Sequence, residues 1–161
     1  MFDAFAWASQ KKNVSVELRP YTPDDLSDVL SIWEAAIRQS CPFLSDDFLA
    51  EERANIAEKW MPICECWIAS NEAGDTVGFV ALVGNEVGGL FVHPSAQGSG
   101  HGRALVNKAQ ALRGRLEVGV FKKNEIGRRF YAAYGFTYQR EHIQEETGEV
   151  ELRLVFNPSI A

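Results

Sequence analysis

The stretch that decides the fold runs from Leu90 to Leu105 and reads LFVHPSAQGSGHGRAL. It consists of a short apolar run, a proline break, a glycine-rich turn and the beginning of a helix. Its glycines alternate at positions 98, 100 and 102. Glycine accepts positive φ and lets the backbone approach a ligand closely, and the first N–H groups of a helix attract an anion. The stretch therefore predicts a loop that binds phosphate.

The spacing of these glycines separates three kinds of phosphate loop. A Walker loop requires G-x-x-x-x-G-K-[ST], which the chain lacks, and a Rossmann loop requires G-x-G-x-x-G, which places the third glycine elsewhere. Residues 97–102 read QGSGHG and fit the pattern Q/R-x-x-G-x-G/A. Taken alone, the loop is also compatible with a strand-to-helix turn whose glycines serve packing.

A second motif lies between Asn124 and Phe136 and reads NEIGRRFYAAYGF. Together with the glycine loop it resembles the GCN5-related N-acetyltransferase (GNAT) family, whose closing motif is N-x-x-A/G-x-x-[LF]-Y-x-x-x-G-F. The positions that match are Asn124, Gly127, Phe130, Tyr131, Gly135 and Phe136. The resemblance covers about residues 16–156, and small bacterial acetyltransferases are the most similar members. It implies acetyl-coenzyme A as co-substrate and an amine as acceptor. No metal is expected, because the three histidines form no ligand spacing with the cysteines.

Apolar periodicity and turn residues predict seven strands and four helices. The expected strands are 14–20, 65–70, 76–83, 87–92, 116–121, 136–143 and 149–156, and the expected helices are 22–40, 46–60, 100–112 and 124–134. We therefore expect an α/β (α+β) domain over residues 14–161, with a mixed sheet covered by helices on both faces, and an N-terminal extension over residues 1–13. The resemblance adds that the sheet is mostly antiparallel and that two central strands splay apart. The pair Gly88-Gly89 predicts a bulge or a close backbone approach at that point.

The resemblance assigns the co-substrate mainly to main-chain groups. Backbone N–H groups of residues 98–103 would bind the diphosphate, and unpaired groups at Leu90, Phe91 and Val92 would pair with the pantetheine arm. The N–H of Val92 would face the thioester oxygen, and Asn124 would cap its helix and contact the arm. The expected cofactor-binding residues are Leu90, Phe91, Val92, Gln97, Gly98, Ser99, Gly100, His101, Gly102, Arg103, Asn124 and Tyr131.

Tyr131 is the predicted general acid, because a departing thiolate needs a proton and a phenol with a pKa near about 10 keeps its proton at neutral pH. Tyr134 competes for this role, since it lies three residues further on, and packing in the core is the alternative reading of either ring. The family motif selects Tyr131. The general base stays open: the family's glutamate position falls on Gly119, Glu117 lies two residues earlier, and a water chain or no dedicated base is equally compatible.

The acceptor side is expected between the first two helices and the closing hairpin, where Phe43 and Leu44 could form a wall. Acidic side chains gather there in two runs and suit either a cationic amine or simply a solvated surface. They are Asp46, Asp47, Glu51 and Glu52, then Glu141, Glu145, Glu146, Glu149 and Glu151.

The length, net charge and cysteine count of the chain exclude some classes of protein. The chain has 161 residues and a net charge of −6, so it offers no basic surface for nucleic acid. Its three cysteines, without a secretory signal, favour reduced thiols in the cytoplasm, and no apolar run has the length of a membrane span. We expect a cytoplasmic N-acetyltransferase, monomeric or homodimeric. A non-catalytic acyl-CoA sensor is the alternative.

Overall fold

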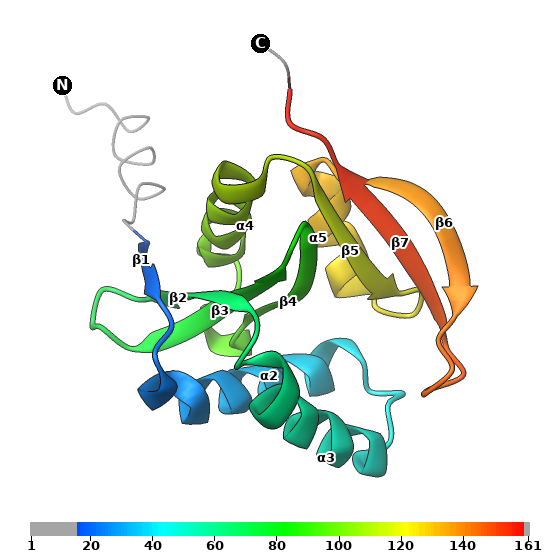
Figure 1. Ribbon diagram of the computed structural model, residues 1–161, viewed down its shortest axis with the longest axis horizontal. Coiled ribbons are helices and arrows are strands. Elements are labelled where there is room, and N and C mark those ends of the chain that lie inside the picture. The colour runs from blue at the N-terminus through cyan, green and yellow to red at the C-terminus, as the bar shows by residue number, and fades with distance from the viewer. Residues whose placement is uncertain (1–15, 160–161) are drawn as a thin grey trace, which may run out of the picture.

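The computed structural model describes residues 16–159, which form one seven-stranded sheet with helices packed against it (Figure 1). The strands are β1 (Glu17–Pro20), β2 (Glu65–Ser70), β3 (Thr76–Val83), β4 (Glu86–Val92), β5 (Leu116–Phe121), β6 (Thr137–Ile143) and β7 (Val150–Phe156). The helices are α2 (Leu26–Ser40), α3 (Asp46–Asn55), α4 (His101–Arg113) and α5 (Glu125–Tyr134). A π-helical turn, Ile56–Trp60, extends α3, and short 3-10 turns occupy Pro23–Asp25 and Pro94–Ala96. The predicted elements are confirmed, most of them within one or two residues at each end.

The strand order is β1-β2-β3-β4-β5-β7-β6. Of the pairs formed by residues 16–159, only β4 with β5 is parallel, and all others are antiparallel. The expected α/β fold with a mixed, mostly antiparallel sheet is therefore confirmed. The proposed extension, residues 1–13, and the expected start of the first strand at residue 14 lie outside the described residues.

Local sequence signals explain where the elements begin and end. The Ser45 hydroxyl accepts a hydrogen bond from the N–H of Phe48 at 3.1 Å and so caps α3. In the turn between β2 and β3, the side chain of Asn71 accepts from the N–H of Asp75, and Gly74 adopts a φ of +87°. These contacts join residues close in sequence, which is why the pattern of residues alone predicts the turns.

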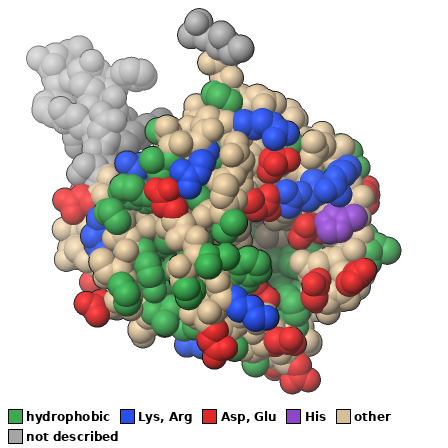
Figure 2. All heavy atoms as spheres, viewed as in Figure 1, with side chains coloured by type: hydrophobic (Ala, Val, Ile, Leu, Met, Phe, Trp, Pro, Cys, Tyr) green, Lys and Arg blue, Asp and Glu red, His purple; other side chains and the backbone are tan. Residues whose placement is uncertain are grey.

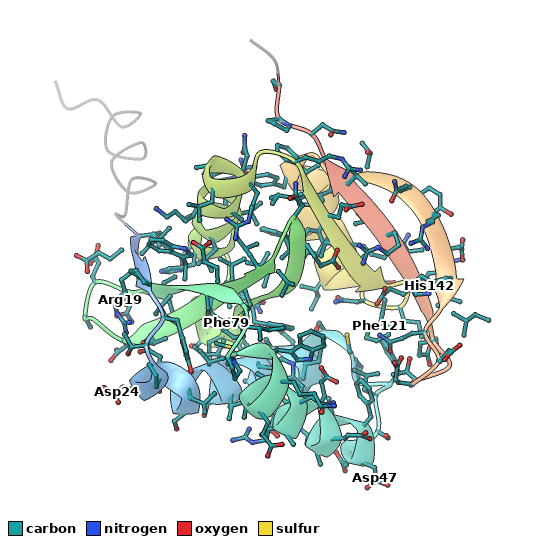
Figure 3. The ribbon with its side chains drawn as sticks, in the orientation of Figure 1. Arg19, Asp24, Asp47, Phe79, Phe121 and His142 are labelled. Atoms are coloured by element: carbon teal, nitrogen blue, oxygen red, sulfur yellow. The ribbon has the colours of Figure 1, made fainter. Side chains whose placement is uncertain are left out.

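Two hydrophobic cores lie on opposite faces of the sheet. On one face, α4 and α5 bury residues such as Leu105 and Tyr131 against the inner positions of β5 and β7. On the other face, α2 and α3 pack Trp33 and Leu49 against β2 and β3, with Phe79 between sheet and helix (Figure 3). Among the described residues, none of the helices is long and apolar enough to cross a membrane.

The second face is covered unevenly. Helices α2 and α3 lie over the β2–β4 half, whereas the same face of β5–β7 carries charged side chains that Figure 2 shows gathered on one side of the molecule. Arg153 of β7 donates to both carboxylate oxygens of Glu86 of β4 through its two terminal nitrogens, Nη1 and Nη2. Helices therefore lie on both faces, as expected, but one half of the sheet leaves one face open.

Candidate active site

A cavity of about 1140 Å³ connects the glycine loop before α4 with the open face of β5–β7. Its walls come from α2, α3, the whole of β4, β5, α5 and the turn between β6 and β7. In the space-filling view, hydrophobic side chains surround a hollow near the centre of the face (Figure 2). The cavity thus passes through the sheet where β4 and β5 separate.

The glycine loop forms one end of this cavity and exposes its main chain. Gly98 and Gly100 have φ of +82° and +89°, and a Cβ on either would meet no atom within 4 Å, so glycine is required there by the backbone and not by crowding. Among residues 16–159, none of the N–H groups from Gly98 to Arg103 donates a hydrogen bond to another residue. A row of free N–H groups at the start of a helix is a suitable cradle for a diphosphate.

Other features of this loop position it against the rest of the protein. A Cβ at Gly102 would lie 3.1 Å from the ring of Phe130, so this glycine allows α4 to approach α5. The His101 ring is buried, with Nδ1 3.3 Å from the carbonyl oxygen of Ala96. Gln97 donates to the carbonyl oxygen of Val92 at 3.0 Å. Ser99 alone of residues 97–103 does not line the cavity, although its N–H belongs to the free row.

Strand β4 leaves its neighbour after two residues. The parallel ladder joins Glu86 to Glu117 and Val87 to Val118 and then stops. On the β3 side, Ala81 faces Gly89 and Leu82 faces Val87, so Gly88 is the extra residue of a bulge. The bulge expected at the paired glycines is confirmed, and among residues 16–159 no strand pairs with the rest of β4 on its β5 side.

The register decides which groups of β4 are free. The N–H of His93 donates to the carbonyl oxygen of Val77, and antiparallel pairs alternate between bonded and non-bonded. Phe91 therefore turns its main-chain groups toward Phe79, while Leu90 and Val92 turn theirs toward the opening. The prediction that Phe91 offers unpaired main-chain groups is wrong for this reason, and only its ring lines the cavity.

Tyr131 of α5 lies between the two ends of the cavity. Its side chain lines the wall and the residue is only 7% exposed. Within residues 16–159 its hydroxyl has no hydrogen-bond partner, yet no sealed side-chain oxygen or nitrogen is unsatisfied there, so the hydroxyl opens into the cavity. Burial, and next the nearby charge of Glu86, raise the pKa of this phenol. It keeps its proton well into the alkaline range and can donate it.

Tyr134, the competing tyrosine, has its hydroxyl occupied elsewhere. It donates toward Asn107 Oδ1 at 2.7 Å and Gln110 Oε1 at 2.9 Å, both on α4. It does not line the cavity. Tyr134 therefore ties α5 to α4 and does not face the space that Tyr131 faces.

Asn124 caps α5 as expected, because its Oδ1 accepts from the N–H of Gly127 at 2.8 Å. A Cβ at Gly127 would lie 2.7 Å from Nδ2 of Asn124, which explains why a glycine follows three residues later. Asn124 also lines the cavity. Capping and contact with a bound arm are thus compatible in this geometry.

Known proteins share this arrangement. The Acetyltransferase (GNAT) domain family matches residues 62–138. The chain is 29% identical over 121 residues to peptidyl-lysine N-acetyltransferase YjaB of Escherichia coli (strain K12), which is 75% of this chain and 82% of that protein. The solution structure of apo YjaB from Escherichia coli has a TM-score of 0.78 and 26% identity, over 88% of this chain and 97% of that one.

The family model, the YjaB relatives and the shared fold together support a GCN5-related N-acetyltransferase. Its activity is acetyl-CoA-dependent N-acetyltransfer. The fold is also shared with the PaiA N-acetyltransferase of Thermoplasma acidophilum, a structure in complex with coenzyme A, at a TM-score of 0.69 and 15% identity over 86% of this chain and 98% of that one. The free N–H row and the opened strand fit the diphosphate and the pantetheine arm of such a co-substrate.

Gly119 stands at the position where some GNAT enzymes carry a glutamate, and side chains of the neighbouring strand β7 fill the space beside it. A Cβ at Gly119 would lie 2.6 Å from Oε1 of Glu151 and 3.0 Å from Nη1 of Arg153, both on β7. His142 of β6 in turn contacts Glu151 at 3.0 Å. Glu117, the other candidate base, does not line the cavity and lies 3.5 Å from Arg115.

Glu86 is a cavity residue that sequence reasoning missed. It lines the wall, and its charge contributes to the raised pKa of Tyr131. In the sequence it stands in Gly84-Asn85-Glu86 and looks like a turn residue. Only the ladder with β5 and the ion pair with Arg153 place it at the site.

The two residues expected at the acceptor wall of the acetyltransferase have different positions. Leu44 lines the cavity. Phe43 does not, because its ring packs edge-on against Phe121, with centroids 5.6 Å apart. Phe121, at the end of β5 (Figure 3), is the ring that lines the cavity itself. The contact between them holds the α2–α3 connection against β5.

Proposed function

We propose that this acetyltransferase transfers the acetyl group to the ε-amino group of lysine residues in peptides or proteins. One observation carries the proposal: the free hydroxyl of Tyr131 opens into a cavity that has unbonded main-chain N–H groups at one end and an open mouth at the other. YjaB and YiaC of Escherichia coli, which the chain resembles, are named peptidyl-lysine N-acetyltransferases, and YiaC is 26% identical over 131 residues.

The residues divide the work as follows. The N–H groups of the glycine loop hold the diphosphate. The main-chain groups of Leu90 and the N–H of Val92 orient the pantetheine arm along the edge of β4, whereas the Val92 carbonyl oxygen already accepts from Gln97. The N–H of Val92 faces the thioester oxygen, where it stabilises developing negative charge. The neutral amine attacks the thioester carbon directly, the C–S bond breaks, and the Tyr131 hydroxyl gives its proton to the departing sulfur. The proton that the amine nitrogen loses then restores the Tyr131 hydroxyl. Phe121 and Leu44 border the path of the amine.

The thiols of this cavity take no part in the proposed transfer. Cys41 and Cys64 line it, and burial raises the pKa of both thiols, so they stay protonated at neutral pH. A cysteine that attacked the thioester would need to be a thiolate. Direct transfer to the amine is therefore the simpler route. The proposed setting is the cytoplasm, where cysteines stay reduced.

The test uses acetyl-CoA with a peptide that has a blocked N-terminus and one lysine. Release of free thiol is followed over time, and mass spectrometry locates the acetyl group. The matched control peptide carries glutamine in place of the lysine, and a set of small amines runs in parallel. We expect transfer to the lysine peptide and none to the glutamine peptide.

Two outcomes contradict the proposal in different ways. Thiol release with small amines but not with the lysine peptide would show that the acceptor class is wrong. Binding of acetyl-CoA by calorimetry without transfer to any amine would instead favour a sensor.

A further inference from the structure

The acidic residues around the acceptor mouth are not equivalent. Of the two acidic runs, 46–52 and 141–151, only Glu52 and Glu146 contribute side chains to the cavity wall. The members that pair elsewhere are Asp46 with Arg38, Glu141 with Lys122, Glu149 with Lys123 and Glu151 with His142. The structure thus reduces a general acidic surface to two carboxylates that face one space.

These two carboxylates come from opposite sides of the mouth. Glu52 belongs to α3 and Glu146 to the turn between β6 and β7, which comes down on the side where α3 begins (Figure 1). Within residues 16–159 neither forms an ion pair. Partial burial raises the pKa of Glu52, against a hydrogen bond from Asn55, and the negative charges of Glu146 and Glu51 raise it further to a smaller extent. The two charges are therefore close enough to interact, and a cation between them would relieve their repulsion.

The other charges at this end leave the balance negative. Glu86 is neutralised by Arg153, which bonds it through both nitrogens. Lys59 also lines the cavity and partly offsets Glu52, but it lies beyond ion-pair distance from both carboxylates. Arg103 belongs to the opposite end, at the glycine loop. The cavity is thus polarised, with N–H groups and an arginine at one end and unpaired carboxylates at the other.

Two further features show that this space receives a ligand. The Tyr131 side chain, 7% exposed as a residue, directs an unpartnered hydroxyl into the same cavity. Trp60, 46% exposed, lines the cavity beside Lys59. An exposed indole near carboxylates is a favourable surface for the ammonium or guanidinium group of a bound peptide.

We propose that Glu52 and Glu146 bind a second cationic side chain of the acceptor, so that the enzyme prefers a lysine with an arginine or lysine close to it in sequence. This inference rests on the proposed peptide acceptor and adds its sequence preference. The two negative charges, one from α3 and one from the β6–β7 turn, hold the cationic side chain of the peptide while its acceptor lysine extends toward Tyr131. Arginine is the better partner, because its planar guanidinium can bond two carboxylate oxygens at once.

The experiment compares three peptides that differ only beside a single acceptor lysine. The neighbours are two arginines, two alanines or two glutamates, and the N-terminus is blocked. We expect kcat/KM to be about tenfold higher for the arginine peptide than for the alanine peptide, as two partly exposed charge pairs would give. The glutamate peptide should be the poorest, and the preference should shrink at high salt.

Matched substitutions locate the preference on the protein. Glu52→Gln and Glu146→Gln should each lower the ratio of arginine to alanine peptide by about threefold, mainly through KM. Glu51→Gln and Glu145→Gln, one residue away and outside the cavity wall, should leave the ratio unchanged. Lys59→Met should raise it, because the opposing charge is gone.

Three results of these experiments would overturn the inference, and they differ in what they imply for the proposed lysine acceptor. Equal rates on the three peptides would overturn the inference and leave the proposed lysine acceptor intact. A preference that responds equally to Glu51→Gln and Glu52→Gln would also overturn it, because general surface charge would then suffice. Failure to acetylate any of the peptides would overturn both the inference and the proposed function.

Discussion

The two ends of the cavity are built from different parts of the chain. At the glycine loop, the wall is formed by a single short run, Gly98 to Arg103, of which all residues except Ser99 line the cavity and whose N–H groups are free within residues 16–159. At the acceptor mouth, side chains from α3, β4 and the β6–β7 turn meet, and the residues that supply them lie far apart in sequence. The first end depends on backbone conformation, and the second depends on how distant elements pack.

This difference explains how one fold can keep a co-substrate and change its acceptor. A backbone cradle tolerates few substitutions, because its geometry comes from φ angles that only glycine adopts easily. A mouth built from exposed side chains can change one residue at a time at little cost to stability. Tyr131 lies where the two ends meet, so its substitution should test the chemistry separately from either end.

The largest effect is expected from Tyr131→Phe. Loss of the hydroxyl should lower kcat about 100-fold or more, because a positioned acid contributes this much in the transition state. The dissociation constant of acetyl-CoA, measured by calorimetry, should stay within about twofold.

Tyr134→Phe is the matched control for that substitution. It removes hydrogen bonds to Asn107 and Gln110, so it should lower the free energy of unfolding by about 1 kcal/mol and leave kcat unchanged. If both variants turned over at the wild-type rate, the acid would have to be sought elsewhere.

The next effect is expected at the loop end, from Gly100→Val. No atom crowds this position, so the substitution acts through the φ of +89°, which a β-branched residue adopts only with strain. We expect acetyl-CoA to bind about tenfold more weakly with a smaller change in kcat.

Gly74→Val is the control, because Gly74 has a φ of +87° and equally open surroundings but lies in the β2–β3 turn. Gly74→Val should lower the free energy of unfolding about as much as Gly100→Val does, and its affinity for acetyl-CoA should be unchanged. Equal losses of binding in both variants would show that the loop end acts only through stability.

A smaller effect is expected at the acceptor end, from Gly119→Ala. The added Cβ would lie 2.6 Å from Glu151 Oε1, so that carboxylate must move away from His142. Thermal unfolding should show a loss of about 1–2 kcal/mol. Gly88→Ala, whose Cβ would meet only Ala81 at 3.6 Å, should cost less. A larger loss of stability for Gly88→Ala than for Gly119→Ala would mean that the charged side chains of β7 accommodate an added methyl group more easily than the β4 bulge does.

The smallest expected change is one of pH dependence. Burial raises the pKa of Tyr131, so its proton is present below the ordinary phenol pKa and is not lost as the pH rises through about 10. Because the acceptor amine loses its own proton over that range, kcat/KM should rise with pH and show no decline up to about pH 10. A decline that begins well below that value, and disappears in Tyr131→Phe, would contradict the raised pKa.

Much of the fold could be read from the sequence because its signals are local. The caps at Ser45 and Asn124, the turn at Asn71 and the glycines of the loop all act within about four residues. The two motifs also select Tyr131 over Tyr134, and the structure agrees in placing only Tyr131 on the cavity wall. Its role as the acid stays a prediction.

The errors and gaps arose where distant residues decide the outcome. The main chain of Phe91 is paired because of the ladder with β3, and the sequence contains no sign of that register. The ring of Phe43 packs against Phe121, and Phe121 lines the cavity wall instead of Phe43. The charge partners of Glu86 could not be assigned either, because Arg153 is 67 residues away.

The sequence by itself determined the elements, their approximate bounds, the glycine loop and the resemblance to the GNAT family, because each depends on the order of residues along a short stretch. Only the tertiary structure decided which main-chain groups of β4 remain free, which face of β5–β7 stays open, and that Glu52 and Glu146 alone, of the nine acidic residues in the two runs, face the cavity. The physical reason is the separation in sequence between the residues that interact. Caps and turns form between neighbours in the chain, whereas register, burial and charge pairing depend on packing between segments far apart in sequence.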